Sequence, residues 1–179
     1  MLYNLFQAQE NFSKRNKLFI ILNFNKKQQN KNRNVLNKFN FNEISVLDLF
    51  SGTGNVSYEF ASRGCPNLLS IDNNHKCIKF INKTASELEL NINTKKIDYK
   101  VFLKKNKKKF DIIFADPPYN AAQEIKELID LLASGQYLKP GGVFILEHQT
   151  MAAIQHPAII EKREYGQSTF SFFKFEDKQ

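Results

Sequence analysis

The chain has 179 residues, of which 42% are hydrophobic and 25% are charged. This length suits one domain with a full core, and no window approaches the roughly 18 apolar residues that a membrane span needs. A net charge of +8 favours a polyanionic partner such as RNA or DNA, although a codon bias toward Lys and Asn would give the same excess.

The cysteines and the N-terminal residues indicate the cellular compartment in which the protein is expected. Cys65 and Cys77 have neither metal-ligand nor disulfide spacing, and the N-terminus lacks the basic and apolar regions of a signal peptide. We therefore expect a cytoplasmic monomer with reduced thiols. The three histidines are scattered along the chain, so we expect no metal site.

Residues 1–43 differ from the rest of the chain. They contain eleven Asn, eight Lys or Arg and only two acids, and they have no Gly and no Pro. We predict a basic N-terminal arm here, either poorly ordered or contacting RNA. Val35, Leu36, Phe39 and Phe41 are candidates for docking on the edge of the domain that we expect over 44–179.

From Ile44 onward, apolar strands alternate with amphipathic helices. The expected strands are 44–49, 68–72, 96–99, 111–115 and 143–147. The expected helices are 55–63, one that follows a cap at Asn73 or Asn74 and runs to about 90, a short one from 101, and 121–134. A turn is expected over 137–142. A closing antiparallel hairpin is expected over 159–165 and 168–175, with its second strand buried on both faces.

This alternation predicts an α/β fold in which βαβ units form a mostly parallel, seven-stranded sheet with helices on both faces. Asp48, Asp72, Asp98 and Asp116 fall at or just after the ends of four expected strands. Ligands bind at that rim in open α/β sheets, so we interpret these four acids as parts of a ligand site.

The first strand runs into a glycine-rich turn, in which Gly52 and Gly54 permit a tight bend near Phe50. A dinucleotide fingerprint would have a third glycine, which is absent here. Asp48 would repel a pyrophosphate but suits the ammonium group of a methionine moiety. The loop therefore favours S-adenosylmethionine over NAD.

Two further strand ends extend the predicted cofactor site. Asp72 lies about twenty residues after the glycine turn, where an acidic residue accepts hydrogen bonds from ribose hydroxyls, and Asn73 follows it. Asp98 and Tyr99 either meet the adenine or serve a capping or surface role.

The sequence Asp116-Pro117-Pro118-Tyr119 is the sharpest signal for the reaction. Two prolines fix the backbone and remove two N–H donors. What remains is the Asp116 carboxylate and bare carbonyls, notably that of Pro117, and this all-acceptor turn suits an exocyclic amine. The Tyr119 ring offers a surface on which an extruded base could stack.

With both motifs in place, the chain over about 44–175 resembles the class I S-adenosylmethionine-dependent methyltransferases, and among them the RsmD-like 16S ribosomal RNA guanine-N2 methyltransferases. The resemblance implies a Rossmann-like fold, S-adenosylmethionine as cofactor, and a target guanine in small-subunit RNA, position 966 in standard ribosomal numbering, methylated in a partly assembled subunit. Residues 1–43 lack the glycine-containing strand pair and the Arg-Pro-Thr-type segment with which that family opens.

Four alternatives stay open from the sequence. The enzyme could methylate adenine N6 in DNA, although such enzymes favour Asn at the position of Asp116. The protein could also bind RNA without catalysis. Lys104 to Lys109 either grip phosphates or form a solvated face. Glu147 and His148 either line the pocket or are structural.

Overall fold

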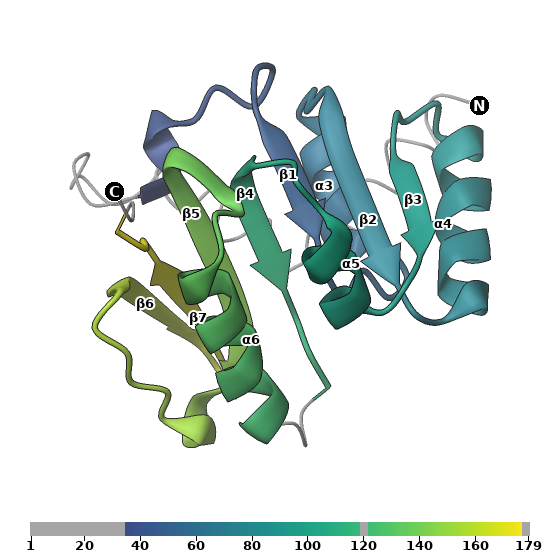
Figure 1. Ribbon diagram of the computed structural model, residues 1–179. Helices are drawn as coiled ribbons and strands as arrows, with labels where there is room; N and C mark the ends of the chain where they lie inside the picture. Colours follow the sequence, from purple (N-terminus) through teal and green to yellow (C-terminus); the bar gives the residue numbers. More distant parts are fainter. Residues whose placement is uncertain (1–34, 119–121, 177–179) are drawn as a thin grey trace.

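The computed structural model describes residues 35–118 and 122–176. Its centre is a seven-stranded sheet with the order β3-β2-β1-β4-β5-β7-β6 (Figure 1). The strands are β1 Ser45–Asp48, β2 Asn67–Asp72, β3 Asn93–Lys96, β4 Phe110–Ala115, β5 Leu138–Gln149, β6 Ile159–Tyr165 and β7 Ser168–Phe173. Strands β1 to β5 are parallel, whereas β7 runs antiparallel to both β5 and β6. The predicted α/β class, the mostly parallel sheet and the closing hairpin are confirmed.

The central strands carry continuous apolar runs because helices cover both faces of the sheet. Along β1 and β4, Val46 and Ile112 pack into one core cluster, whereas Leu47 and Ile113 pack into the other. Strand β7 is buried at every residue, as predicted from its irregular alternation.

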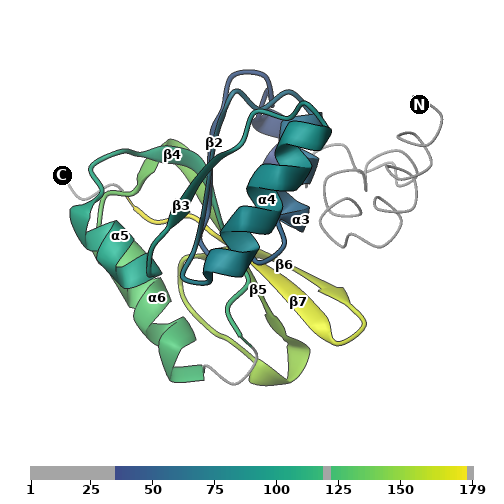
Figure 2. The same cartoon turned by 90° about the vertical axis from the view of Figure 1, so that its right-hand side faces the viewer.

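The helices are α3 Asn55–Ser62, α4 His75–Glu87, α5 Tyr99–Lys105 and α6 Ala122–Ser134. Figure 2 shows α5 and α6 side by side on one face of the sheet, and α3 with α4 on the other. In the first layer, Phe102 of α5 and Leu128 of α6 share a cluster with Leu47. In the second, Phe60 of α3 packs with Val46.

The segment before β1 docks on the domain, as predicted. It forms the 3-10 helix η2 Val35–Lys38, and Leu36 is 2% exposed in the same cluster as Val46. Residues 1–34 lie outside the described residues, so the expectation of an arm there stays a prediction, as does a domain boundary between residues 43 and 44.

Three predicted element boundaries were wrong. The third strand is Asn93–Lys96 rather than 96–99, and Asp98 and Tyr99 start helix α5 instead of ending a strand. Helix α4 ends at Glu87, ahead of Glu89, whose φ of 54° is left-handed. Strand β5 begins at Leu138, inside the predicted turn, and its pairing with β4 shifts register between Phe110 and Ile112, where β5 passes through Gly141 at a φ of 74°.

Candidate functional site

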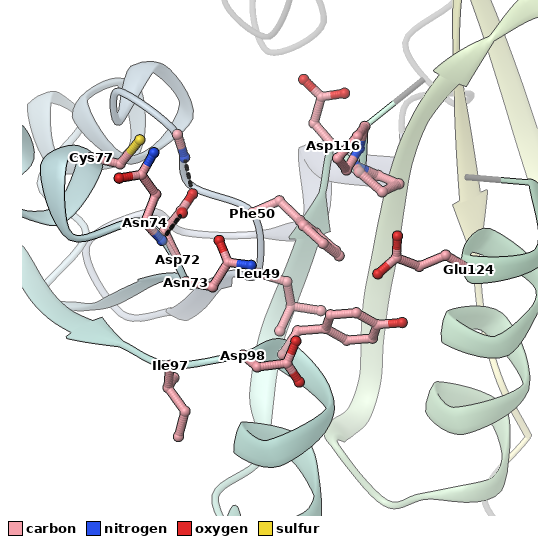
Figure 3. Close-up of a pocket in the computed structure, with 14 residues that line it drawn as sticks. Leu49, Phe50, Asp72, Asn73, Asn74, Cys77, Ile97, Asp98, Asp116 and Glu124 are labelled. Atoms are coloured by element: carbon pink, nitrogen blue, oxygen red, sulfur yellow. Dashed lines mark hydrogen bonds between the residues drawn. The ribbon is translucent and has the colours of Figure 1, made fainter. Parts of the chain in front are cut away.

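The loops after β1, β2, β3 and β4 meet around a cavity of about 450 Å³ at the carboxyl ends of the strands (Figure 3). This volume lies within the range that small-molecule sites usually occupy. The predicted residues that line it are Phe50, Gly52, Asp72, Asn73, Asp98, Tyr99, Asp116, Pro117 and Pro118. Tyr119 lies outside the described residues. The structure thus brings both sequence motifs to one cavity.

The two glycines of the glycine turn have different structural roles. Gly52 lines the cavity at a φ of 50°, with open space where a Cβ would be. Gly54 does not line the cavity; it is the N-cap of α3 at a φ of 89°. A Cβ on Gly54 would lie 2.8 Å from Cγ1 of Ile81 and 2.9 Å from Cζ of Tyr58. Gly54 is therefore required by helix packing rather than by close approach of a ligand.

Asp48 lies beneath this turn and does not line the cavity. It is fully buried, and its Oδ2 accepts a hydrogen bond of 2.6 Å from the Ser57 hydroxyl, which also contacts the Ser70 hydroxyl at 2.6 Å. Burial raises the pKa of Asp48 to about 7, against the opposing effect of the Ser57 bond. Asp48 is not among the residues that line the cavity, so the contact with an ammonium group that the sequence suggested stays a prediction. Its bond to Ser57 ties Asp48 to the first turn of α3.

Asp72 links the first two loops. Its Oδ2 accepts a hydrogen bond of 2.8 Å from the Gly52 amide, and its Oδ1 accepts one of 2.7 Å from the Asn74 amide (Figure 3). Asn74 in turn caps α4 by accepting from the Lys76 amide at 2.9 Å. Of the two asparagines proposed as the cap, Asn74 takes that role, and Asn73 lines the cavity. Two backbone donors fix the Asp72 carboxylate and leave each oxygen a lone pair for a ligand hydroxyl.

Of the roles that the sequence left open for Asp98 and Tyr99, the structure shows the cap, and the contact with adenine stays a prediction. Asp98 caps α5 by accepting at Oδ1 from the amides of Lys100 and Val101, at 2.9 and 3.1 Å, and it also lines the cavity. The Tyr99 ring packs on Phe50 with centroids 4.9 Å apart. Burial first, and then the charge of Glu124, raise the pKa of Tyr99 to about 12, so its hydroxyl stays protonated.

The turn after β4, which the sequence predicts to be the reaction turn, also lines the cavity. Asp116 and Pro118 flank the buried Pro117, and all three line the cavity. Neither proline has an N–H group, so the turn presents acceptors along these two residues. The Leu49 amide donates to the Phe114 carbonyl at 2.9 Å and holds this turn close to the glycine turn.

Five lining residues were missed from the sequence: Leu49, Asn74, Cys77, Ile97 and Glu124. Glu124 had a usable signal, because it lies in the first turn of the helix that follows the reaction turn. Cys77 had none, and burial raises the pKa of its thiol, which keeps the thiol protonated and weakly nucleophilic.

Glu147 and His148 lie away from the cavity lining. His148 is 3% exposed, and its Nε2 and Nδ1 lie 2.8 Å from the Ser171 hydroxyl and the Gln149 carbonyl. Burial lowers the pKa of His148, which favours the neutral ring. Of the two interpretations, the structural one therefore holds for His148.

The lysine run lies at the opposite end of α5 from the cavity. Helix α5 begins at the rim with Tyr99 and ends at Lys105, and the lysines over 104–109 are exposed. Whether they contact phosphates stays a prediction. None of the described helices is long and apolar enough to cross a membrane. Within residues 35–118 and 122–176, no group of three or more acidic, His or Cys side chains is gathered as metal ligands would be.

The strand order, the antiparallel β7 and a ligand cavity at the ends of β1 to β4 define a class I methyltransferase fold. Residues 22–174 match the family described as "Conserved hypothetical protein 95". The chain belongs to this family, the RsmD-like class I S-adenosylmethionine-dependent methyltransferases.

Three known proteins illustrate the relationship. The chain is 33% identical over 104 residues to "Ribosomal RNA small subunit methyltransferase D" of Buchnera aphidicola, a match that covers 58% of this chain and only 53% of that protein. It is 28% identical over 137 residues to YlbH of Bacillus subtilis, which is named provisionally as an rRNA methyltransferase, and covers 74% of it. The solved structure of the Haemophilus influenzae protein HI0767 superposes with a TM-score of 0.67 at 21% identity, over 76% of this chain and 89% of that one, which supports the fold.

Proposed function

We propose that this protein transfers a methyl group from S-adenosylmethionine to the exocyclic N2 of a guanine in 16S ribosomal RNA. The observation that carries the proposal is the acceptor turn Asp116-Pro117-Pro118, which faces the same cavity as the glycine turn and Asp72. An amine nitrogen needs no activation by a strong base if its hydrogens are held and its lone pair is aimed at an electrophile. The names of the Buchnera and Bacillus relatives support ribosomal RNA as the substrate.

The cavity lining fits this cofactor. Asp72 has acceptors fixed for ribose hydroxyls, and Phe50 and Ile97 add apolar surface for a purine ring. The Tyr99 ring packs against Phe50 and extends this apolar surface. When bound, S-adenosylmethionine would supply an electrophilic methyl group on its sulfonium.

The residues of the reaction turn would act mainly by positioning. The Asp116 carboxylate and the Pro117 carbonyl accept the two N2 hydrogens of guanine, and Tyr119 stacks on the base. Asp116 also accepts the proton that leaves N2 after transfer. Positioning of this kind can contribute about 7–11 kcal/mol to lowering a barrier.

The test is transfer of a tritiated methyl group to small ribosomal subunits, naked 16S RNA and DNA, followed by nucleoside analysis of the product. We expect N2-methylguanosine from the ribosomal substrates. Label found only in N6-methyladenine of DNA would refute the proposal in favour of the DNA alternative. Failure to bind S-adenosylmethionine in a calorimetric titration would instead favour the non-catalytic RNA-binding alternative.

A further inference from the structure

A second cavity, of about 830 Å³, lies where α6 ends and β5 begins, and Ser134, Leu138 and Gly142 line it. Helix α6 runs to this place from the end of the reaction turn (Figure 1). A rise of about 1.5 Å per residue over its length separates the two cavities by about 20 Å. They share no lining residue, so the second cavity is a separate site at the opposite end of the sheet.

Four lysines gather around the second cavity. Lys139 and Lys174 line it. Lys38 and Lys109 reach its edge, because each donates a side-chain hydrogen bond to a residue of the lining. These lysines come from η2, the loop before β4, strand β5 and the segment after β7. The fold therefore assembles this cationic rim from four separate segments of the chain.

The positive charge of the rim is mostly uncompensated. Lys139 forms an ion pair with Asp111 at 2.7 Å, whereas in the part of the chain that the structure describes the other three have no acidic partner. Burial first, and then the charge of Lys174, lower the pKa of Lys38, so these two ammonium groups are close enough to repel each other. Glu176 also lines the cavity, and the end of α6 adds only about half a negative charge. Like charges held together in this way favour a bound anion.

The lining inside the rim offers apolar and ring surfaces. Leu132, Pro157 and Phe175 line the cavity, and the His156 ring meets the Phe175 ring edge-on with centroids 6.2 Å apart. The volume lies in the range of sites that hold whole small molecules, so it has room for a base as well as a phosphate. Proteins that bind single-stranded nucleic acid combine a cationic groove along the backbone with rings on which bases stack.

Charge also decides between possible occupants of the second cavity. Residues 1–34 join the described chain three residues before Lys38, and they carry seven Lys or Arg and a single acid, Glu10. The cationic rim would repel a segment of this composition, whereas it would attract a polyanion. The exposed lysines over 104–108 continue the positive surface from Lys109 toward α5.

We propose that the second cavity binds an unpaired segment of the substrate RNA, with phosphates on Lys38, Lys109 and Lys174 and a base inside the cavity. The assignment rests on the proposed function. Because the cavity lies about 20 Å from the reaction turn, it does not contact the target guanine. It contributes affinity for the RNA around the target, and the chemistry of transfer does not depend on it.

The experiment measures binding of naked 16S RNA and of small ribosomal subunits over a range of salt concentrations. The test protein is the double variant Lys38→Gln/Lys174→Gln. Its matched control, Lys79→Gln/Lys83→Gln, removes the same charge from exposed positions of α4, on the other face of the sheet. Ala133→Phe fills the cavity without changing the charge.

The test variant is expected to bind naked RNA about tenfold or more weakly than wild type. The slope of its log affinity against log salt should fall by about 1.4, or about 0.7 for each lost contact with a single strand. Ala133→Phe should lose about fivefold or more with an unchanged slope, because it removes room for a base. In both cavity variants KM for RNA should rise, while kcat and affinity for S-adenosylhomocysteine stay within about twofold of wild type. The control should match wild type within about twofold throughout.

Four results would overturn the inference. Equal losses in the two double variants would show a general effect of charge and no site. Weaker binding to small subunits but not to naked RNA would assign the cavity to a ribosomal protein. Wild-type affinity for RNA in both cavity variants, with methyl transfer intact, would remove the site and leave the proposed function standing. Wild type that neither binds nor methylates RNA or subunits would overturn the proposed function as well.

Discussion

The buried carboxyl of Asp48 should make stability depend on pH in a way that one substitution removes. Its folded-state pKa of about 7 lies roughly three pH units above its ordinary value of 3.8, because burial disfavours the charge. The folded protein therefore holds this proton more tightly than the unfolded chain does. Wild type loses stability as the pH rises from about 4 to about 7, and the loss is complete above that range.

Asp48→Asn keeps the shape of the side chain and cannot ionise. Each pKa unit is worth about 1.4 kcal/mol, so the free energy of unfolding of the variant relative to wild type should rise by up to about 3 kcal/mol between about pH 4.5 and about pH 8. Urea unfolding of both proteins across this range gives that difference directly. Titration of the other groups cancels in the comparison.

Asp111→Asn is the matched control, because Asp111 has the opposite shift. Its Oδ2 accepts hydrogen bonds from Lys139 at 2.7 Å and from the Ser45 amide and hydroxyl at 2.7 and 2.8 Å. Burial alone would raise the pKa of Asp111, but these bonds outweigh it and lower the pKa. Asp111 contributes stability that is lost only as the pH falls through its lowered pKa, so Asp111→Asn should cost a nearly constant amount above about pH 4.5. A constant difference for Asp48→Asn too, or one that falls toward pH 8, would refute the buried-charge argument.

Four further variants test the site and the packing around it. Asp116→Ala should reduce methyl transfer by about a hundredfold or more in a single-turnover assay. Its affinity for S-adenosylhomocysteine, measured by calorimetry, should stay within about threefold of wild type. Loss of cofactor binding in the folded variant would contradict the assignment of Asp116 to the reaction turn. Asp72→Ala should weaken cofactor binding by about tenfold or more in the same titration, and unchanged affinity would remove it from the ribose role. Gly54→Ala should destabilise the protein by about 2–3 kcal/mol in urea, because it adds a clash with Ile81 to a left-handed φ. Gly52→Ala, with open space at its Cβ, should cost only about 1–2 kcal/mol, and equal losses would show that packing does not distinguish the two glycines.

The fold was predictable wherever a buried element has a recognisable run or period of apolar residues. β4 is buried from Ile112 to Ala115, and its apolar run marked it as a strand. β3 was misplaced for the opposite reason. It is an edge strand of sequence Asn-Thr-Lys-Lys with no buried residue, so no hydrophobic period marks it. Strand β3 forms because its backbone pairs with β2, and this pairing leaves no hydrophobic pattern in the sequence.

The sequence predicted most of the residues that lie at the cavity, but it was a poorer guide to what each of them contacts. Acids at strand ends placed Asp72 and Asp116 at the cavity correctly, because the topology of a parallel sheet decides that position. Asp48 has the same sequence context, yet it is covered by its own loop and bonded to Ser57. Which side of a loop a carboxylate faces depends on packing between segments distant in sequence. The same holds for Glu124, which is brought to Tyr99 only by the contact of α5 with α6.

The open sheet ends in two strands that each lack a described partner on their outer side, and both carry charge. On β3 the outermost residues include Lys95 and Lys96, whereas β6 carries the run from Glu161 to Glu164 with Lys162 and Arg163 between the acids. Unpaired sheet edges are templates for pairing with a second chain, and charged side chains there oppose such pairing. Two like-charged β3 edges would repel each other on approach. The sheet thus has protection against edge-to-edge aggregation at both ends, by net positive charge on β3 and by charges of both signs on β6.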